Sequence, residues 1–322
     1  MSESVIIGID GGGSKTLIAA AHQDGTVVEL RRGAATSPLE SASWSETLSR
    51  QVQPFLAAAP ILGVAAGLPA HGEVEHVSEA QRQVIADLFG PAPQRVLNDV
   101  DAAHIGGFGG GPGILILAGT GSMAWARDGA GQSHRTGGWG EIIGDEGSGH
   151  WIGKRVLEAV SKSMDGRAAP TRLAQGIFTQ LGLDPAEPVN ALEGWVSRFA
   201  NPRTQIASLA PIAFAEAEAG DATALGLIEA AADELALHVT TLHKRLGTAE
   251  LRWSYAGGLF SSARLRDAVA RRLGRPPEAP RLPPIGGALL AAAQHLGWQI
   301  DDAWLDRLAS SLDALPARTE ET

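Results

Sequence analysis

One succession of strands and turns occurs twice in the chain and limits the folds open to it. Near the start, an apolar run ends at Asp10 and a glycine triplet, a second apolar run follows, and the turn Asp24-Gly25 leads to a third. The same order recurs over residues 114–135, where the loop Gly119-Thr120-Gly121-Ser122 replaces the triplet. Each copy predicts strand, loop, strand, turn, strand. The repetition indicates a duplicated domain whose two polar glycine loops face one another across a cleft, a natural site for a phosphorylated ligand.

Further elements can be expected between and after the two hairpins. Apolar runs and helical spacing predict buried strands over residues 60–68 and 95–97, a helix over residues 78–88, and a long helix capped by Asp221. The first lobe is then α/β and the second more helical.

The length of 322 residues also favours two lobes over a single core. We expect an N-terminal lobe over residues 1–112 and a C-terminal, more helical lobe over residues 113–300. An amphipathic helix over residues 301–316 is expected to join the N-terminal lobe.

Composition narrows the function classes. The net charge of -10 and the absence of a basic run argue against nucleic acid or an anionic membrane as partner. Apolar residues never form the roughly 18-residue uncharged stretch that a membrane helix needs, and the first residues lack the basic start of a secretion signal, so we expect a cytoplasmic protein. The chain has no cysteine, which excludes disulfides, thiolate metal sites and cysteine nucleophiles.

The first glycine loop, Asp10 to Thr16, suits a bound phosphate. Its glycines free backbone N–H groups to converge on phosphate oxygens, while Asp10 can hold hydrated magnesium. The alternative is an ordinary hairpin with a glycine bulge. The matching loop Gly119 to Ser122 favours the phosphate interpretation, because it stands at the same place in the repeat.

Two carboxylates follow the predicted strand at residues 95–97. Phosphoryl transfer to a hydroxyl needs a carboxylate within hydrogen-bond reach of that hydroxyl, and Asp99 and Asp101 are candidates. In the alternative, Asp99 caps the next helix and Asp101 is solvated.

Two later glycine-rich stretches suit a sugar and a nucleoside. Residues 137–149 combine glycines, acids and Trp139, and sugar sites use carboxylates for hydroxyl groups and tryptophan for the apolar ring face. A structural loop in which Ser148 or Asp145 caps the next helix is the alternative. Residues 255–262 read as strand, glycine pair and helix start, where adenine and ribose could lie on bare backbone.

Taken in order, these motifs, together with Ile285-Gly286-Gly287-Ala288, resemble the N-acetylglucosamine kinase family, which includes bacterial glucosamine kinases and the BadF/BcrA-type ATPases. The resemblance runs from near the start to about Leu290. It implies an α/β fold of two ribonuclease-H-like lobes, as in actin and hexokinase, with a central cleft that closes over sugar and MgATP. A homodimer is also implied.

Site residues follow from the same resemblance. Asp99 would be the base that accepts the proton of the sugar's 6-hydroxyl, and Asp10 would hold Mg2+. ATP would contact Gly11, Gly12, Gly13, Ser14, Lys15, Thr120, Gly121, Ser122, Gly257 and Gly258. The sugar would contact Ser37, Asp99, Gly138, Trp139, Gly140 and Asp145.

The chain departs from the family pattern in two ways. The loop after the first hairpin carries Ser37 where N-acetylglucosamine kinases usually have an asparagine that touches the sugar, which leaves open the choice between acetylated and free amino sugar. The lack of cysteine rejects the branch that couples ATP hydrolysis to an iron–sulfur cluster, and also the zinc site usual in ROK-type sugar kinases.

The function expected is therefore an ATP-dependent kinase that transfers the γ-phosphate to the 6-hydroxyl of N-acetylglucosamine or glucosamine. The alternative is a nucleotide-switched ATPase, an activator or chaperone-like binding protein that phosphorylates no sugar.

Overall fold

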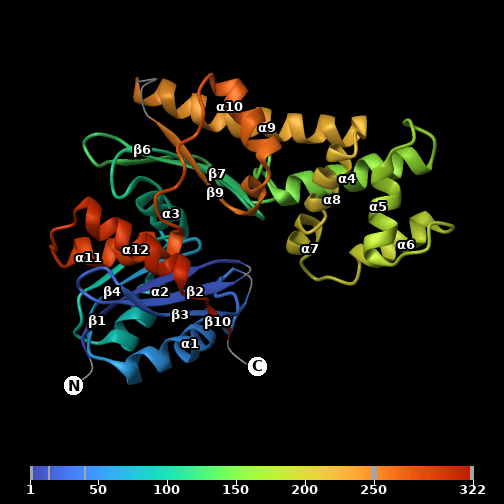
Figure 1. Ribbon diagram of the computed structural model, residues 1–322. Helices are drawn as coiled ribbons and strands as arrows, with labels where there is room; N and C mark the ends of the chain where they lie inside the picture. Colours follow the sequence, from blue (N-terminus) through green and yellow to red (C-terminus); the bar gives the residue numbers. More distant parts are fainter. Residues whose placement is uncertain (1–2, 14, 40, 248–251, 320–322) are drawn as a thin grey trace. The chain divides into compact units, whose positions relative to one another are not determined.

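The computed structural model describes residues 3–13, 15–39, 41–247 and 252–319 (Figure 1). Contacts divide the chain into two compact units. Unit 1 contains residues 1–115, 127–132 and 279–322, and unit 2 contains residues 116–126 and 133–278.

Unit 1 is built on a six-stranded sheet in the order β10-β3-β2-β1-β4-β5. The first three strands form the predicted antiparallel meander, and β4 and β5 continue from β1 in parallel. The strands are β1 (Val5–Gly11), β2 (Thr16–Ala21), β3 (Val27–Gly33), β4 (Ile61–Leu68), β5 (Gln94–Asn98) and β10 (Arg318–Thr319). The strands predicted over residues 60–68 and 95–97 are thus confirmed.

Helices cover both faces of this sheet. Successive residues of β1 point to opposite faces, and each set packs against a different group of helices. Ile6 belongs to a core with α3 (Asp99–Phe108), α11 (Pro284–His295) and α12 (Asp302–Ala314). Ile7 and Ile9 belong to a second core with α1 (Trp44–Ala58) and α2 (Glu75–Phe89). The helix predicted over residues 78–88 is part of α2.

The units differ from the expected lobe boundaries at three segments: residues 113–115 and 127–132, which are short, and one longer segment, all expected in the C-terminal lobe. Residues 279–300, assigned from the sequence to the C-terminal lobe, belong to unit 1. Helix α11 is buried from Ile285 to Ala293 and packs against α3 and β1, so its apolar surface is covered by unit 1. Helix α12 also lies in unit 1, where the indole of Trp304 donates to the carbonyl of Gln23 (3.0 Å).

Unit 2 repeats the strand order of unit 1. Its four-stranded sheet runs β8-β7-β6-β9, so the meander β6-β7-β8 matches β1-β2-β3, and β9 lies beside β6 as β4 lies beside β1. The strands are β6 (Gly113–Ala118), β7 (Ser122–Arg127), β8 (Ser133–Gly137) and β9 (Trp253–Ala256). This agreement confirms the duplicated strand pattern predicted from the sequence.

Unit 2 is also the more helical one. Its helices are α4 (Gly149–Met164), α5 (Arg172–Leu181), α6 (Pro188–Val196), α7 (Arg203–Ala207), α8 (Ala210–Glu218), α9 (Ala222–Leu246), the 3-10 helix η1 (Gly258–Ser261) and α10 (Ala263–Leu273). Asp221 caps α9 as predicted, since its carboxylate accepts from the backbone N–H of Ala224 (2.8 Å).

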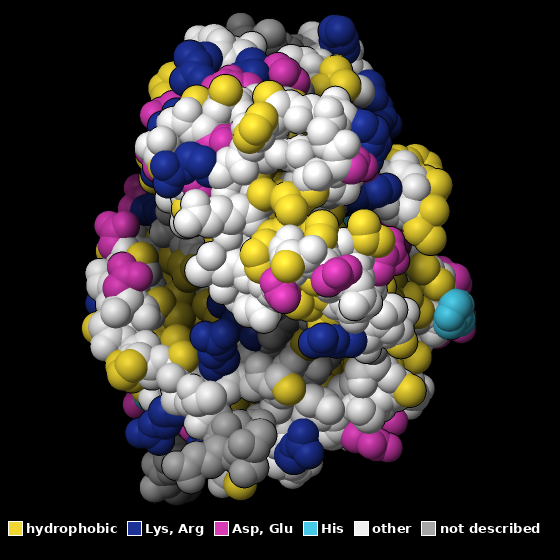
Figure 2. Space-filling view, turned by 90° about the vertical axis from the view of Figure 1, so that its right-hand side faces the viewer, with side chains coloured by type: hydrophobic (Ala, Val, Ile, Leu, Met, Phe, Trp, Pro, Cys, Tyr) yellow, Lys and Arg dark blue, Asp and Glu magenta, His cyan; other side chains and the backbone are white. Residues whose placement is uncertain are grey.

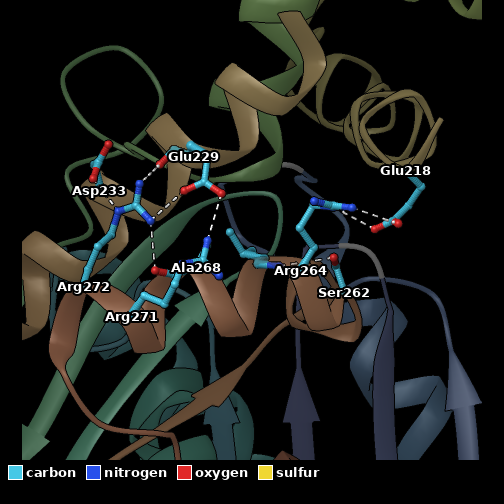
Figure 3. A network of polar contacts seen from close by, with 9 residues as sticks. Glu218, Glu229, Asp233, Ser262, Arg264, Ala268, Arg271 and Arg272 are labelled. Carbon is cyan, nitrogen blue, oxygen red and sulfur yellow. Dashed lines mark hydrogen bonds and ion pairs between the residues drawn. The ribbon is translucent and has the colours of Figure 1, made fainter. Parts of the chain in front are cut away.

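Ion pairs on the surface of unit 2 join α10 to its neighbours (Figure 3). Arg271 pairs with Glu229 (3.0 Å), and Arg272 pairs with Glu229 (2.9 Å) and with Asp233. Arg264 reaches Glu218 at the end of α8 (2.8 Å). Exposed pairs of this kind contribute little each to stability.

The outer surface is mixed in charge. On the face drawn in Figure 2, acidic and basic side chains are interspersed. Within the described residues, no helix is both long enough and apolar enough to cross a membrane.

Candidate active site

In unit 1, the carboxyl ends of three neighbouring strands bring Asp10 and Asp99 to one edge of the sheet. Asp10 pairs in register with Gly67 of β4, and the next residue of β4, Leu68, pairs with Asn98 of β5. Asp99 follows directly as the first residue of α3. A Cβ atom on Gly67 would lie 2.7 Å from the Cβ of Ala102, so glycine is needed for α3 to approach this closely.

Both carboxyl groups hold a proton more tightly than an ordinary aspartate. Burial raises the pKa of Asp10 to about 7; the charge of Asp99 adds to the increase, and Lys15 opposes it. Burial also raises the pKa of Asp99 to about 7, helped by the charge of Glu73 and opposed by the backbone N–H of Val100. A carboxylate with a pKa near neutrality is suited to accept a proton.

Asn98 connects this edge to the loop after β4. Its side-chain oxygen caps α3 by accepting from the N–H of Val100 (2.9 Å). Its side-chain nitrogen donates to the carbonyl of His71 (3.0 Å) and to Glu73 (3.4 Å). Glu73 was not predicted as a site residue. The sequence offers one indication of it: Glu73 is an acidic residue shortly after the predicted strand at residues 60–68.

The alternative in which Asp101 is solvated is wrong. Asp101 is buried and pairs with Arg127 of β7 at 2.8 Å, because α3 turns its side chain inward. The alternative in which Asp99 caps α3 is also wrong: Asn98 is the cap, and Asp99 is the first residue of the helix, where its carboxylate accepts from the N–H of Val100 (3.0 Å).

The first glycine loop joins β1 to β2 beside Asp10. Gly11 pairs with Thr16 at the end of the hairpin, Gly12 and Gly13 follow Gly11, and Lys15 is exposed. Ser14, predicted to contact phosphate, lies outside the described residues. Behind the loop, the hydroxyl groups of Thr16 and Thr36 are 2.8 Å apart, and Ser37 next to Thr36 is buried.

In unit 2, the loop Gly119 to Ser122 is held against the start of α4. The N–H of Gly149 donates to the carbonyl of Gly119 (2.8 Å), and the N–H of His150 donates to that of Thr120 (3.1 Å).

Gly257 lies at the same end of the unit 2 sheet. It has a φ of 96°, and a Cβ atom there would collide with the carbonyl of Ala118 at the end of β6. Gly258 follows with exposed backbone. The predicted phosphate and nucleoside contacts of unit 2 are therefore neighbours.

The loop of residues 137–149 contains both buried and exposed side chains. Asp145 is buried; one carboxylate oxygen accepts from the N–H of Ser122 (3.2 Å) and the other pairs with Arg203 (2.7 Å). Trp139 is 66% exposed. Gly138 and Gly140 have φ of 72° and 79°, respectively. The hydroxyl of Ser122 donates to the carbonyl of Glu146 (2.6 Å).

Of the two capping candidates in this loop, Ser148 is the one that caps α4: its hydroxyl accepts from the N–H of Trp151 (3.1 Å). The sequence analysis missed Arg203, which lies 58 residues beyond Asp145 and shares no motif with it.

Strained backbone occurs in two loops of the candidate site. Among the described residues, Ala70 and Asp145 are the non-glycine residues with positive φ, at 61° and 62°. Ala70 lies in the loop that carries Glu73, and Asp145 in the loop that carries Trp139. Left-handed backbone in such residues costs energy and is often retained at functional sites.

Asp10 is the candidate metal ligand of unit 1. Within the described parts of the chain, no group of three His, Cys, Asp or Glu side chains is arranged to hold one. Magnesium in phosphoryl-transfer sites is commonly held by one or two carboxylates together with water and substrate phosphates. Asp10, a desolvated carboxylate beside a glycine loop, fits that role.

Comparison with known proteins identifies a family. A model of the BadF/BadG/BcrA/BcrD ATPase family matches residues 7–292. An N-acetylmuramic acid/N-acetylglucosamine kinase of Clostridium acetobutylicum is 32% identical over 244 residues, 73% of this chain and 78% of the relative. An N-acetyl-D-glucosamine kinase of Dictyostelium discoideum is 30% identical over 270 residues, 77% of this chain and 82% of the relative.

Solved structures share the fold. One from Chromobacterium violaceum, described as a candidate N-acetylglucosamine kinase, has a TM-score of 0.70 and 29% identity and covers 90% of this chain and 99% of its own. A ROK family glucokinase from Streptomyces griseus has a TM-score of 0.58 at 14% identity, with 90% of this chain and 98% of its own covered. The second likeness concerns the fold alone. Together they confirm the predicted α/β fold with two ribonuclease-H-like lobes.

Proposed function

The chain belongs to the BadF/BadG/BcrA/BcrD ATPase family, and from that premise we propose that it is an ATP-dependent kinase of an amino sugar. Relatives that cover most of its length are kinases of N-acetylglucosamine, N-acetylmuramic acid and glucosamine. The reaction transfers the γ-phosphate of ATP to the 6-hydroxyl of N-acetylglucosamine or glucosamine.

The observation that carries the proposal is the environment of Asp99. The carboxyl follows β5, whose last two residues are buried, at the start of a helix, and its pKa is raised to about 7. Such a group accepts the proton of the sugar hydroxyl as the oxygen attacks phosphorus, and it is ionised in a useful fraction of molecules at neutral pH. Asn98 holds the start of α3 and so supports the orientation of Asp99.

Charge on the phosphates is the second requirement. Mg2+, when bound, neutralises phosphate charge, and Asp10 is the residue proposed to hold it. Backbone N–H groups of Gly11, Gly12 and Gly13 in unit 1 are proposed phosphate contacts, with Lys15 beside them. In unit 2 the proposed contacts are Thr120, Gly121 and Ser122, and Gly257 and Gly258 support the adenosine.

The sugar is assigned to the remaining loops. Trp139 has an exposed indole that can cover the apolar face of a ring. Gly138 and Gly140 beside it leave the backbone accessible. Ser37 and Asp145 remain proposed sugar contacts; both side chains are buried, and Asp145 is paired with Arg203.

The alternative function, a nucleotide-switched ATPase without sugar phosphorylation, is not favoured, because relatives at 27% to 32% identity are sugar kinases. The cytoplasm, where ATP is available, remains the proposed location, and a homodimer remains a prediction.

An ADP-release assay tests the proposal. Purified protein with MgATP is given glucosamine, N-acetylglucosamine, N-acetylmannosamine, N-acetylmuramic acid, glucose or buffer alone. We expect one hexosamine to stimulate ADP release strongly and Asp99→Asn to abolish the stimulation. Asp87→Asn, an exposed change on α2, is the control and should behave as wild type. ADP release that is indifferent to every sugar would refute the proposal and favour the nucleotide-switched ATPase.

A further inference from the structure

Arg203 is a half-buried residue of unit 2 that contacts the predicted site residue Asp145. It is the first residue of α7, its side chain is 25% exposed, and the side chain of Asp145 beside it is 4% exposed. Its Nη2 lies 2.7 Å from one oxygen of Asp145, and its Nε lies 3.4 Å from a carboxylate oxygen of Glu141. Both acids belong to the loop of residues 137–149, so one guanidinium holds that loop at two points.

The same carboxylate reaches the second glycine loop. The other oxygen of Asp145 accepts from the N–H of Ser122 (3.2 Å). A Cβ atom on Gly121 would lie 2.7 Å from Arg203 Nη2 and 2.7 Å from Asp145 Oδ1. Gly121 thus leaves the space in which the ion pair sits. A continuous series of contacts joins α7, the loop that carries Trp139, and the loop proposed to bind phosphate.

The pair also explains how Asp145 keeps an unfavourable backbone. Its φ of 62° lies in the left-handed region, which is strained for a residue other than glycine. A buried carboxylate that loses its cation is costly, whereas one that is paired and hydrogen-bonded is tolerated. Nη2 of Arg203 donates one hydrogen bond to a single oxygen of Asp145, and a rigid guanidinium holds such a bond in a more fixed direction than an ammonium group does.

We propose that Arg203 is a positioning residue of the kinase: through Asp145 it fixes the sugar-facing loop to the phosphate-facing loop Gly119 to Ser122. The inference rests on the proposed function. Arg203 is not a catalytic residue in this scheme, because its guanidinium is engaged by Asp145 and Glu141. Its removal should loosen the sugar loop first, and the KM for sugar should respond more than kcat.

Kinetics of Arg203→Met, Arg203→Lys, Asp145→Asn and the double variant Asp145→Asn/Arg203→Met test this. We expect Arg203→Met to raise the KM for the hexosamine about tenfold, within the roughly 10²-fold that misplacing a positioning group can cost. Arg203→Lys keeps the charge and should recover part of that loss. In the Asp145→Asn background, Arg203→Met should add less than about twofold, because residues that act through one contact are not additive.

A matched control separates positioning from general stability. Arg272 is 23% exposed, close to the 25% of Arg203, and pairs with Glu229 and Asp233 on the surface (Figure 3). Arg272→Met should leave the KM for the hexosamine and the KM for ATP unchanged. A hexosamine KM unaffected by Arg203→Met, or full additivity in the double variant, would overturn the proposal.

Amide hydrogen exchange gives a readout that does not depend on the sugar. Without any ligand, Arg203→Met should accelerate exchange over residues 137–149, and Arg272→Met should not. If wild type phosphorylates no hexosamine yet the loop exchanges faster in Arg203→Met, the function fails while the structural linkage holds. If exchange over this loop is unchanged, the linkage itself is wrong.

Discussion

The negative charge of Asp99 helps to raise the pKa of Asp10 to about 7, although the two residues belong to segments nearly 90 positions apart in the chain. The shared edge of β1, β4 and β5 brings them within electrostatic reach. Two desolvated carboxyl groups that each favour the neutral form are unfavourable for folding, and such arrangements are commonly found at functional sites.

Activity should therefore depend on pH around neutrality. Asp99 acts as a base only when ionised, and its pKa is raised to about 7. We expect kcat/KM for the hexosamine to rise with pH through about 7 and then level off. Asp99→Asn should lower kcat by about 10²- to 10⁴-fold, the usual contribution of general base catalysis. The measurement is a set of rate profiles in buffers of constant ionic strength; a profile flat from pH 5 to 9 would argue against Asp99.

Stability should show the opposite trend with pH. Because folding raises the pKa of Asp10 and of Asp99, the folded state binds protons more tightly than the unfolded state. The resulting stabilisation is fully present below the unfolded pKa near 4 and is lost as pH rises through about 7. Asparagine does not titrate, so Asp99→Asn should remove part of this loss. The difference in free energy of unfolding between Asp99→Asn and wild type should therefore favour the variant more at pH 8 than at pH 5. Urea unfolding at both pH values checks this, with Asp87→Asn as the reference that keeps the wild-type difference.

Gly257→Ala should weaken ATP binding and the fold together. The φ of 96° is strained for alanine, and its Cβ atom would collide with the carbonyl of Ala118. We expect a loss of about 1–3 kcal/mol in stability and a raised KM for ATP. Gly226→Ala is the control: the site is open, it lies within α9, and alanine should stabilise the helix by about 0.5–1 kcal/mol. A Gly257→Ala protein with wild-type Tm and wild-type KM for ATP would contradict this account.

Breaking the pair of Asp101 and Arg127 should destabilise unit 1. Their side chains are 13% and 15% exposed, so Arg127→Met leaves a buried carboxylate without this cation. We expect a loss of about 3 kcal/mol in the free energy of unfolding. The double variant Asp101→Asn/Arg127→Met should be more stable than Arg127→Met alone, because the buried charge that lost its ion pair with Arg127 is gone. Urea unfolding of wild type and of the two variants measures these stabilities; equal stability of the single and double variants would show that the carboxylate is not the cause.

Much of the local structure could be predicted from residue order. The glycine triplet and the Asp-Gly turns mark the hairpins, Asp221 marks the start of α9, and the repeat predicts two sheets of matching strand order. Asp99 could be singled out because it follows a short apolar run that had to be a buried strand. These features depend on neighbours within a few residues, where turn geometry and hydrophobic periodicity act.

The sequence by itself therefore determined the elements, the duplication and the residue types near each loop. Only the tertiary structure decided which of those residues meet. Helix α11 joins unit 1 because β1 and α3 cover its apolar surface, and Asp145 turns inward because Arg203, far along the chain, supplies the cation a buried carboxylate requires. The pKa of Asp99 likewise depends on burial and on Glu73, both of which arise when distant segments pack together and exclude water.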